Sequence, residues 1–381
     1  MKKTSKISLL AGIIFSISCS WVDATNPVEE SGNLLAELSG QSVFEIRGST
    51  NLQGAIRILS RQTSNVKIAF DKMAKASSEA ESRRFLDLID FKLQVEDDRV
   101  VFKILSPSHA PWEGSDHSVR VEIFVELPEK MSIEGKFDFM VVNIGGPFQG
   151  VDLESGFSNI SVERIFGPVE IVTTYGYIQL HAIKGRLRAE TQNGKISVSD
   201  IIIPSGYALL QSSNGMIRLQ DIQGPVEAYT SYAEINAIDI EAPDGSVVLR
   251  TSYAPIKVQR VRGELIFETS YGPMEIVDVS INHGQSRFET SHAPITARFI
   301  DISNCELYIA NDYNGIDLSI PRDISAVLVA SVSEGGRIST RNLSLKPTVL
   351  NLTRLEALLG DGDSRIEVKV SGIGSINVNG Q

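Results

Sequence analysis

The 381-residue sequence has only two cysteines, Cys19 and Cys305, so a disulfide framework is excluded. If Cys19 is removed or lipidated during export, Cys305 has no partner. We interpret Cys305 as a small buried residue, because no particular histidine can be paired with it to make a nucleophile. The five histidines are scattered without ligand spacing, so the sequence predicts no metal site. Phosphate-binding loops and nucleophile elbows are also missing, and we expect no cofactor.

Positive charge is scarce as well. The 36 Lys and Arg residues face 47 Asp and Glu residues, giving a formal net charge of −11. Nucleic acids select clustered basic residues, so we expect no nucleic-acid partner. Anionic lipid headgroups should repel such a surface. Long apolar runs are missing too, and the sequence predicts no transmembrane helix.

Residues 1–24 have the pattern of a signal peptide, with three early lysines followed by the apolar stretch Ile7–Ile17. A small-residue cleavage site ends at Ala24. Alternatively, the residues up to Cys19 resemble a bacterial lipobox, although Ser16 replaces the usual leucine. We therefore expect export to the periplasm, the outer membrane or the cell surface, with a lipid anchor at Cys19 as the alternative.

A repeat occupies about residues 151–338. Its clearest copies are Thr251–Ile256, Thr269–Met274 and Thr290–Ile295, and the Tyr, Asn or His at the third position recurs every 18 or 21 residues. A period near twenty is typical of a solenoid. The units are rich in Val, Ile, Thr, Tyr and Phe, which favours strands over helices.

Each unit reads as two short strands with one apolar and one polar face. Two such strands cannot bury their apolar faces alone, so we expect the units to stack, with counterparts pairing in parallel. The predicted fold is all-β, a right-handed parallel β-helix or β-solenoid with coils of 18–21 residues. Glycines are expected at the second corner, where positive φ favours them: Gly185, Gly206, Gly224, Gly245 and Gly263.

The domain layout follows from these patterns. Residues 25–41 are polar and acidic, and predict a tether. Residues 42–130 predict less regular β coils and a cap, with one short helix beginning at the capping box Ser78–Glu81. Residues 131–381 predict the regular solenoid, ending in cap strands that follow the turn at 360–364.

Two columns of the repeat lie at the turn. The first is a polar column, Thr173 to Thr290, whose stacked hydroxyls are expected to hydrogen-bond one another. The second is the only recurrent exposed aromatic position. We favour a structural ladder of stacked rings there, and keep a contact row for sugar or peptide as the alternative. The ring residues of this column are Tyr175, Tyr232, Tyr253, Tyr271, His292 and Tyr313.

The coil pattern apolar-x-T-x-x-G-x-I-x-apolar, the strand end Val125–Pro128 and the GDG turn before Ile366 resemble the bacterial putative adhesin family. The resemblance covers about residues 42–380. It implies a β-solenoid domain of envelope proteins, without established catalytic residues to carry over.

The leading hypothesis is a non-enzymatic, adhesin-like interaction scaffold of the envelope, whose partner is an unknown envelope protein or polysaccharide. The alternative is a carbohydrate-active β-helix enzyme, a polysaccharide lyase or hydrolase. Glycosidic cleavage requires paired carboxylates, and the outward column from Glu190 to Ala310 is mixed in charge. Three or more carboxylates with a basic residue in one outward groove would favour the enzyme. Asp361 and Asp363 are interpreted as a solvated turn rather than a calcium site.

Overall fold

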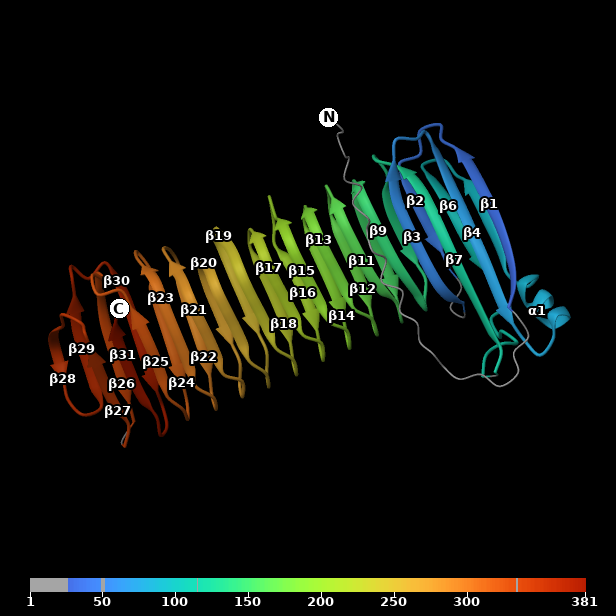
Figure 1. Ribbon diagram of the computed structural model, residues 1–381. Helices are drawn as coiled ribbons and strands as arrows, with labels where there is room; N and C mark the ends of the chain where they lie inside the picture. Colours follow the sequence, from blue (N-terminus) through green and yellow to red (C-terminus); the bar gives the residue numbers. More distant parts are fainter. Residues whose placement is uncertain (1–26, 49–51, 115, 334) are drawn as a thin grey trace, which may run out of the picture.

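The computed structural model describes residues 27–48, 52–114, 116–333 and 335–381. The predicted signal peptide and Cys19 lie outside these residues. Within them the chain is all-β with one helix, α1 (Glu79–Leu86), and every strand joins one hydrogen-bonded sheet. Figure 1 shows the strands stacked side by side along one long axis, with α1 near the N-terminal end.

The strands of the repeat form two parallel series, because each strand pairs with the strand two places further along the chain. This is the pairing of counterparts that the repeat predicts. β19 and β20 contribute one half to each series. Their bounds are Ile235–Arg250 and Ile256–Glu268.

The first series contains β8 (Ser132–Lys136), β10 (Gly150–Ser155), β12 (Val169–Thr173), β14 (Leu187–Thr191), β16 (Ala208–Ser212), β18 (Val226–Thr230), β22 (Gln285–Thr290) and β24 (Glu306–Asn311). The second contains β9 (Met140–Phe148), β11 (Asn159–Ile165), β13 (Ile178–Lys184), β15 (Ile196–Ile202), β17 (Ile217–Gln223), β21 (Met274–Ile281), β23 (Ile295–Ile302) and β25 (Ile316–Ile320). Both series turn their apolar side chains toward one shared core.

The predicted apolar columns are confirmed. Ile178 is in register with Ile196, and Ile196 with Ile217, and all three side chains are fully buried. Phe267 and Phe288 add a stacked pair inside the core, with ring centroids 4.9 Å apart. Burying a large apolar side chain contributes about 1.5–3 kcal/mol, so columns of this kind stabilise the stack of strands.

The corner glycines are only partly as predicted. Gly206, Gly224 and Gly263 have positive φ, whereas Gly185 and Gly245 do not. Gly185 is needed because there is no space for a side chain: a Cβ there would lie 2.1 Å from the Gly167 carbonyl oxygen. The recurrent left-handed position is a different one that sequence reasoning missed. It is occupied on successive turns by Arg164, Ala182, Asp200, Asp221, Asp239, Arg260 and Asp278.

The predicted tether at residues 25–41 is contradicted at its centre. Val28–Glu37 forms strand β1, which pairs antiparallel with β4 (Asn65–Lys75) along its whole length. The side chains alternate along this strand, since Leu34 is half-buried and Ala36 is buried, while Asn33, Leu35 and Glu37 are exposed. The acidic composition concealed this period-two pattern.

The predicted helix is confirmed. The Ser78 hydroxyl accepts a hydrogen bond from the backbone N–H of Glu81 at 3.2 Å, which is one half of a capping box. The Glu81 carboxylate accepts from the backbone N–H of Ser77 at 3.2 Å instead of from that of Ser78. Phe85, Leu86 and Ile89 are buried, as expected. Only this one helix occurs in the described residues, and none there is long and apolar enough to span a bilayer.

The remaining N-terminal strands combine parallel and antiparallel pairs. β2 lies between β6 and β8, and β3 lies between β7 and β9, all in parallel. β5 pairs antiparallel with β6, and β4 with β7. These strands are β2 (Val43–Arg47), β3 (Gln53–Arg61), β5 (Asp90–Val95), β6 (Arg99–Leu105) and β7 (Ser118–Pro128).

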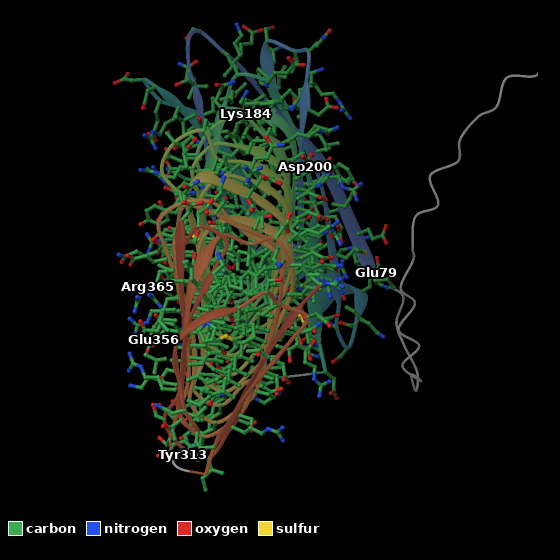
Figure 2. All side chains as sticks on the ribbon, turned by 90° about the vertical axis from the view of Figure 1, so that its left-hand side faces the viewer. Glu79, Lys184, Asp200, Tyr313, Glu356 and Arg365 are labelled. Carbon is green, nitrogen blue, oxygen red and sulfur yellow. The ribbon has the colours of Figure 1, made fainter. Side chains whose placement is uncertain are left out.

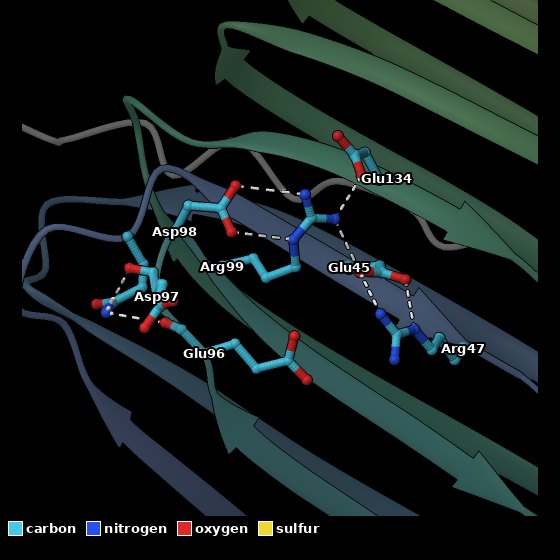
Figure 3. Close-up of polar contacts among 8 residues, drawn as sticks. Glu45, Arg47, Glu96, Asp97, Asp98, Arg99 and Glu134 are labelled. Atoms are coloured by element: carbon cyan, nitrogen blue, oxygen red, sulfur yellow. Dashed lines mark hydrogen bonds and ion pairs between the residues drawn. The ribbon is translucent and has the colours of Figure 1, made fainter.

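A charge network ties this N-terminal part to the first regular strand (Figure 3). Arg99 on β6 lies within 2.9 Å of Glu45 on β2 and 3.0 Å of Glu134 on β8. Arg47 also binds Glu45 through two nitrogens. These hydrogen bonds, from Arg47 first and Arg99 next, hold the pKa of Glu45 below its ordinary value, although burial opposes them.

The C-terminal strands depart from chain order. β30 (Ser364–Val370) lies between β24 and β26, and β31 (Ser375–Gly380) between β25 and β27. They are therefore inserted into the stack, where we expected cap strands at its end. The outer turn is β26 (Ala326–Val332) with β27 (Arg337–Arg341). β26 is covered by the antiparallel pair β29 (Arg354–Leu359) and β28 (Lys346–Leu350), which shields a parallel edge from other chains.

Candidate functional site

The aromatic column forms a ladder at one tip of the cross-section. The rings of Tyr232, Tyr253 and Tyr271 stack with centroids 5.1 Å apart and planes within 2°. His292 continues the stack at 4.5 Å from Tyr271, and Tyr313 follows at 5.0 Å with a 31° tilt. Figure 2, viewed from the C-terminal end, shows Tyr313 at this tip and Lys184 and Asp200 at the opposite end.

A second run of rings lies earlier in the column. Phe139, Phe157 and Tyr175 stack with centroids 4.8 and 5.0 Å apart. The two runs are separated by Asn193 and Asn214, where the Nδ2 of Asn214 donates to the Oδ1 of Asn193 at 2.9 Å. The predicted alignment of the six ring residues is thus present, but in two runs. Whether these rings contact a partner stays a prediction.

The polar column beneath the ladder is buried, as predicted, but its hydroxyls do not bond one another. Six of its seven hydroxyls donate instead to a backbone carbonyl of the preceding turn, whereas the Thr173 hydroxyl has no partner within the described residues. Ser212 Oγ donates to Gly194 O at 3.0 Å, and Thr290 Oγ1 to Gly272 O at 3.3 Å. These bonds satisfy the buried hydroxyl groups that donate them.

A shallow groove runs beside the ladder, along the ends of the first-series strands. Two cavities of about 400 and 430 Å³ make it up, and they meet at Tyr229 and Thr230. The outward column forms one wall, and the residues that directly precede the tip column form the other. These second-wall residues are Thr174, Gln192, Ser213, Ser231, Ser252, Ser270, Ser291 and Asp312.

The middle of the groove is held by one polar cluster. Tyr229 donates its hydroxyl to Glu227 at 2.8 Å, and Arg250 lies over the Tyr229 ring at 5.7 Å. Arg250 also pairs with Glu268 through Nε at 2.7 Å. Burial, together with the bond to Glu227, raises the pKa of the Tyr229 phenol. Tyr229 is therefore a neutral hydrogen-bonding group at neutral pH.

Carboxylates from both walls of the groove cluster more than the sequence indicated. Glu268, Glu289 and Asp312 line one cavity together with Arg250. Three carboxylates with a basic residue in one groove are the arrangement that the sequence analysis required for a carbohydrate-active enzyme. Partners engage all three carboxylates, since Glu268 pairs with Arg250, Glu289 with Arg287, and Asp312 accepts from Ser291 at 2.9 Å.

Cys305 is buried, and burial raises the pKa of its thiol to about 11, which suits a packed residue. At the Gly360 turn, the Ser325 hydroxyl accepts backbone N–H groups of Asp361 and Asp363 at 3.1 and 3.3 Å. In the ranges that the structure covers, no three His, Cys, Asp or Glu residues are grouped as metal ligands.

No family model matches the chain, and no curated protein matches it. The chain matches several solved structures over most of its length, among them three bacterial proteins. One is a putative cell adhesion protein from Clostridium sporogenes, with 10% identity and a TM-score of 0.23, covering 93% of this chain and 100% of that chain. A putative lipid binding protein from Parabacteroides distasonis has 12% identity and a TM-score of 0.23, covering 91% and 96%. A putative adhesin from Bacteroides fragilis has 9% identity and a TM-score of 0.21, covering 92% and 97%. These scores are too low to transfer a residue role or an activity.

Proposed function

We propose that this chain is a non-enzymatic, adhesin-like interaction scaffold of the bacterial envelope. The observation that carries the proposal is the pairing of an exposed ring ladder with a polar groove along one edge of a long stack of strands. A repeated edge offers the same contact groups on successive turns, so several weak contacts add up on an extended partner.

The fold is part of this proposal. The two parallel series are the two faces of one right-handed β-solenoid over residues 131–381, with the residues before it forming the N-terminal cap. The handedness follows the rule for parallel strands that are joined by a crossover. Membership of the bacterial putative adhesin family, and export directed by residues 1–24 to the periplasm or cell surface, complete the proposal.

A binding assay with beads tests whether the chain is an interaction scaffold. Beads coated with the protein are mixed with purified envelope fragments, and the retained material is quantified. The edge variant carries Ser213→Arg and Ser270→Arg, which place bulky charged side chains in the groove; both serines are exposed. The control carries Gln179→Arg and Thr296→Arg on the second series, where both residues are also exposed.

We expect the wild type and the control to retain envelope material and the edge variant to lose most of it. Equal retention by all three proteins would show that the groove edge is not the contact surface. Lack of retention by the wild type would reject the scaffold proposal.

The cluster of Glu268, Glu289, Asp312 and Arg250 supports a second candidate, a carbohydrate-active enzyme. An acid and a base on either side of a glycosidic bond are the requirement for hydrolysis. Release of reducing ends from a panel of polysaccharides tests it, with the double variant Glu268→Gln and Glu289→Gln. The control is Glu275→Gln, which lies on the second series. Turnover that the double variant loses and the control keeps would establish the enzyme, whereas no turnover favours the scaffold.

A further inference from the structure

Within the described residues, the interruption of the aromatic ladder leaves two ring faces that no other ring covers. Tyr175 stacks on Phe157 on one side only, and Tyr232 stacks on Tyr253 on one side only. The turns between them carry Asn193 and Asn214. An asparagine side chain is shorter than a tyrosine side chain, and Tyr175 and Tyr232 are 53% and 64% exposed, so the outer part of each ring remains accessible.

The spacing decides which rings can accept a ligand. A pyranose ring packs at about 3.5–4.0 Å from an aromatic face. No such ring fits between Tyr232 and Tyr253, whose centroids are 5.1 Å apart. Tyr175 and Tyr232 are three turns apart, roughly 14 Å at about 4.8 Å for each strand spacing. This separation leaves space for one pyranose ring against each face.

The floor of the interruption offers matching polar groups. Asn214 uses its Nδ2 to bind the Oδ1 of Asn193. Within the described residues, the Nδ2 of Asn193 and the Oδ1 of Asn214 have no protein partner, and both side chains are exposed. One free donor and one free acceptor side by side fit neighbouring sugar hydroxyls, which both donate and accept.

The groove continues this polar surface directly beside the interruption. The cavity of about 400 Å³ is lined there by Thr174, Gln192 and Ser213, each directly preceding a residue of the tip column in the chain. Glu190 lies on the opposite wall and is paired with Arg188 at 2.8 Å. Two open aromatic faces with hydroxyl, amide and carboxylate groups nearby are the composition of a site that orients a ligand by a few polar contacts.

We propose that the interruption between Tyr175 and Tyr232, with the adjoining groove, is a binding site for a neutral or amino-sugar glycan. The apolar C–H faces of pyranose rings pack on the two tyrosine faces, whose π clouds are electron-rich. The ring hydroxyls contact the amides of Asn193 and Asn214. Acidic groups in the groove and the net charge of −11 disfavour a polyanionic glycan.

An extended peptide is the less suitable occupant. Peptides add to a sheet through an unpaired strand edge. Here β12, β14 and β16 are each hydrogen-bonded to a strand on both sides. The inference rests on the proposed function, because it names the ligand class of the same edge.

The test places tyrosine side chains in the gap between Tyr175 and Tyr232. Asn193→Tyr with Asn214→Tyr completes the ladder and covers both open faces, and the equivalent positions on neighbouring turns already hold tyrosine. The control is Tyr207→Asn, which removes an exposed ring outside the ladder. The probes are hexamers of β-1,4-linked glucose and of β-1,4-linked N-acetylglucosamine, an oligogalacturonate and a proline-rich peptide, all followed by titration calorimetry.

We expect at least one neutral hexamer to bind the wild type and the control, and the filled variant to lose at least tenfold in affinity. Thermal unfolding of the filled variant should be unchanged or shifted upward, which separates blockage from misfolding. The site is rejected if no neutral hexamer binds the wild type, if the filled variant binds as well as the wild type, or if only the peptide or the oligogalacturonate binds. Bead retention without hexamer binding would reject this site and leave the scaffold proposal. Hexamer binding without bead retention would support this site and reject the scaffold proposal.

Discussion

The rings of Tyr253 and Tyr271 lie parallel, with their centroids 5.1 Å apart and their planes 2° from each other. They belong to successive turns, 18 residues apart in the chain. Backbone hydrogen bonds fix this alignment, since the N–H of Tyr253 donates to Ser231 O at 3.0 Å and that of Tyr271 donates to Ser252 O at 2.9 Å. The rings therefore stack because the turns do.

Replacing both rings tests how much the ladder stabilises the stack. Tyr253→Asn with Tyr271→Asn should lower the free energy of unfolding by about 1–2 kcal/mol, because stacked cross-strand pairs are lost. The fold should accept the change, since asparagine already occupies the column at Asn193 and Asn214. Chemical denaturation measures the loss. A stable double variant that no longer retains envelope material would instead identify the central rings as a contact surface.

A charge in the core should be far more damaging. Ile256 is fully buried on β20, and Ile256→Asp would leave a carboxylate there without a partner. The cost of burying an unpaired charge is several kcal/mol, so we expect aggregation or loss of soluble protein. The control Gln179→Asp lies on an exposed position between Ser161 and Ser197 and should melt like the wild type. Normal expression and melting of the Ile256 variant would contradict the assignment of the core columns.

Protonation of Glu45 at low pH should weaken the ion pairs between β2, β6 and β8, and so lower the free energy of unfolding. The folded-state pKa of Glu45 is lowered from its ordinary value of 4.5 by Arg47 and Arg99. Its contribution is therefore complete above the unfolded pKa and is lost as the pH falls through the lower folded pKa. Glu45→Gln should reduce stability at pH 7 by about 1 kcal/mol and flatten this acid-dependent loss.

Denaturation curves from pH 7 down to about pH 3 would measure the effect, a window that spans the carboxylate range. Glu79→Gln is the matched control, because its pair with Arg83 is more than half exposed on both side chains. The control should change stability little at any pH. Parallel curves for the wild type and Glu45→Gln would show that the network does not couple to protonation.

Export can be tested at Cys19, which lies outside the described residues. If Cys19 is lipidated, Cys19→Ala should move the protein from the membrane fraction to the soluble fraction of a Gram-negative host. If the protein instead begins at Thr25, the wild type is already soluble and the substitution has no effect. Fractionation with N-terminal sequencing distinguishes the two exits.

Several features followed from the sequence alone. A period of 18 or 21 residues with alternating apolar positions determined the strands, their parallel pairing and the buried columns, because the side-chain period of a strand is two and the turns must share a core. The capping box determined the helix, since its hydrogen bonds are local. The aromatic ladder also followed, because equivalent residues of stacked turns must lie about one strand spacing apart.

Only the tertiary structure decided the features that depend on contacts between distant segments. The pairing of β1 with β4, and the insertion of β30 and β31 beneath β26 and β27, join residues with no shared pattern in the chain. The groove exists because the outward column and the residues that directly precede the tip column lie beside the same strand ends. The two open ring faces depend on the position of Asn193 and Asn214 within the stack, so their role is visible only when neighbouring turns are seen together.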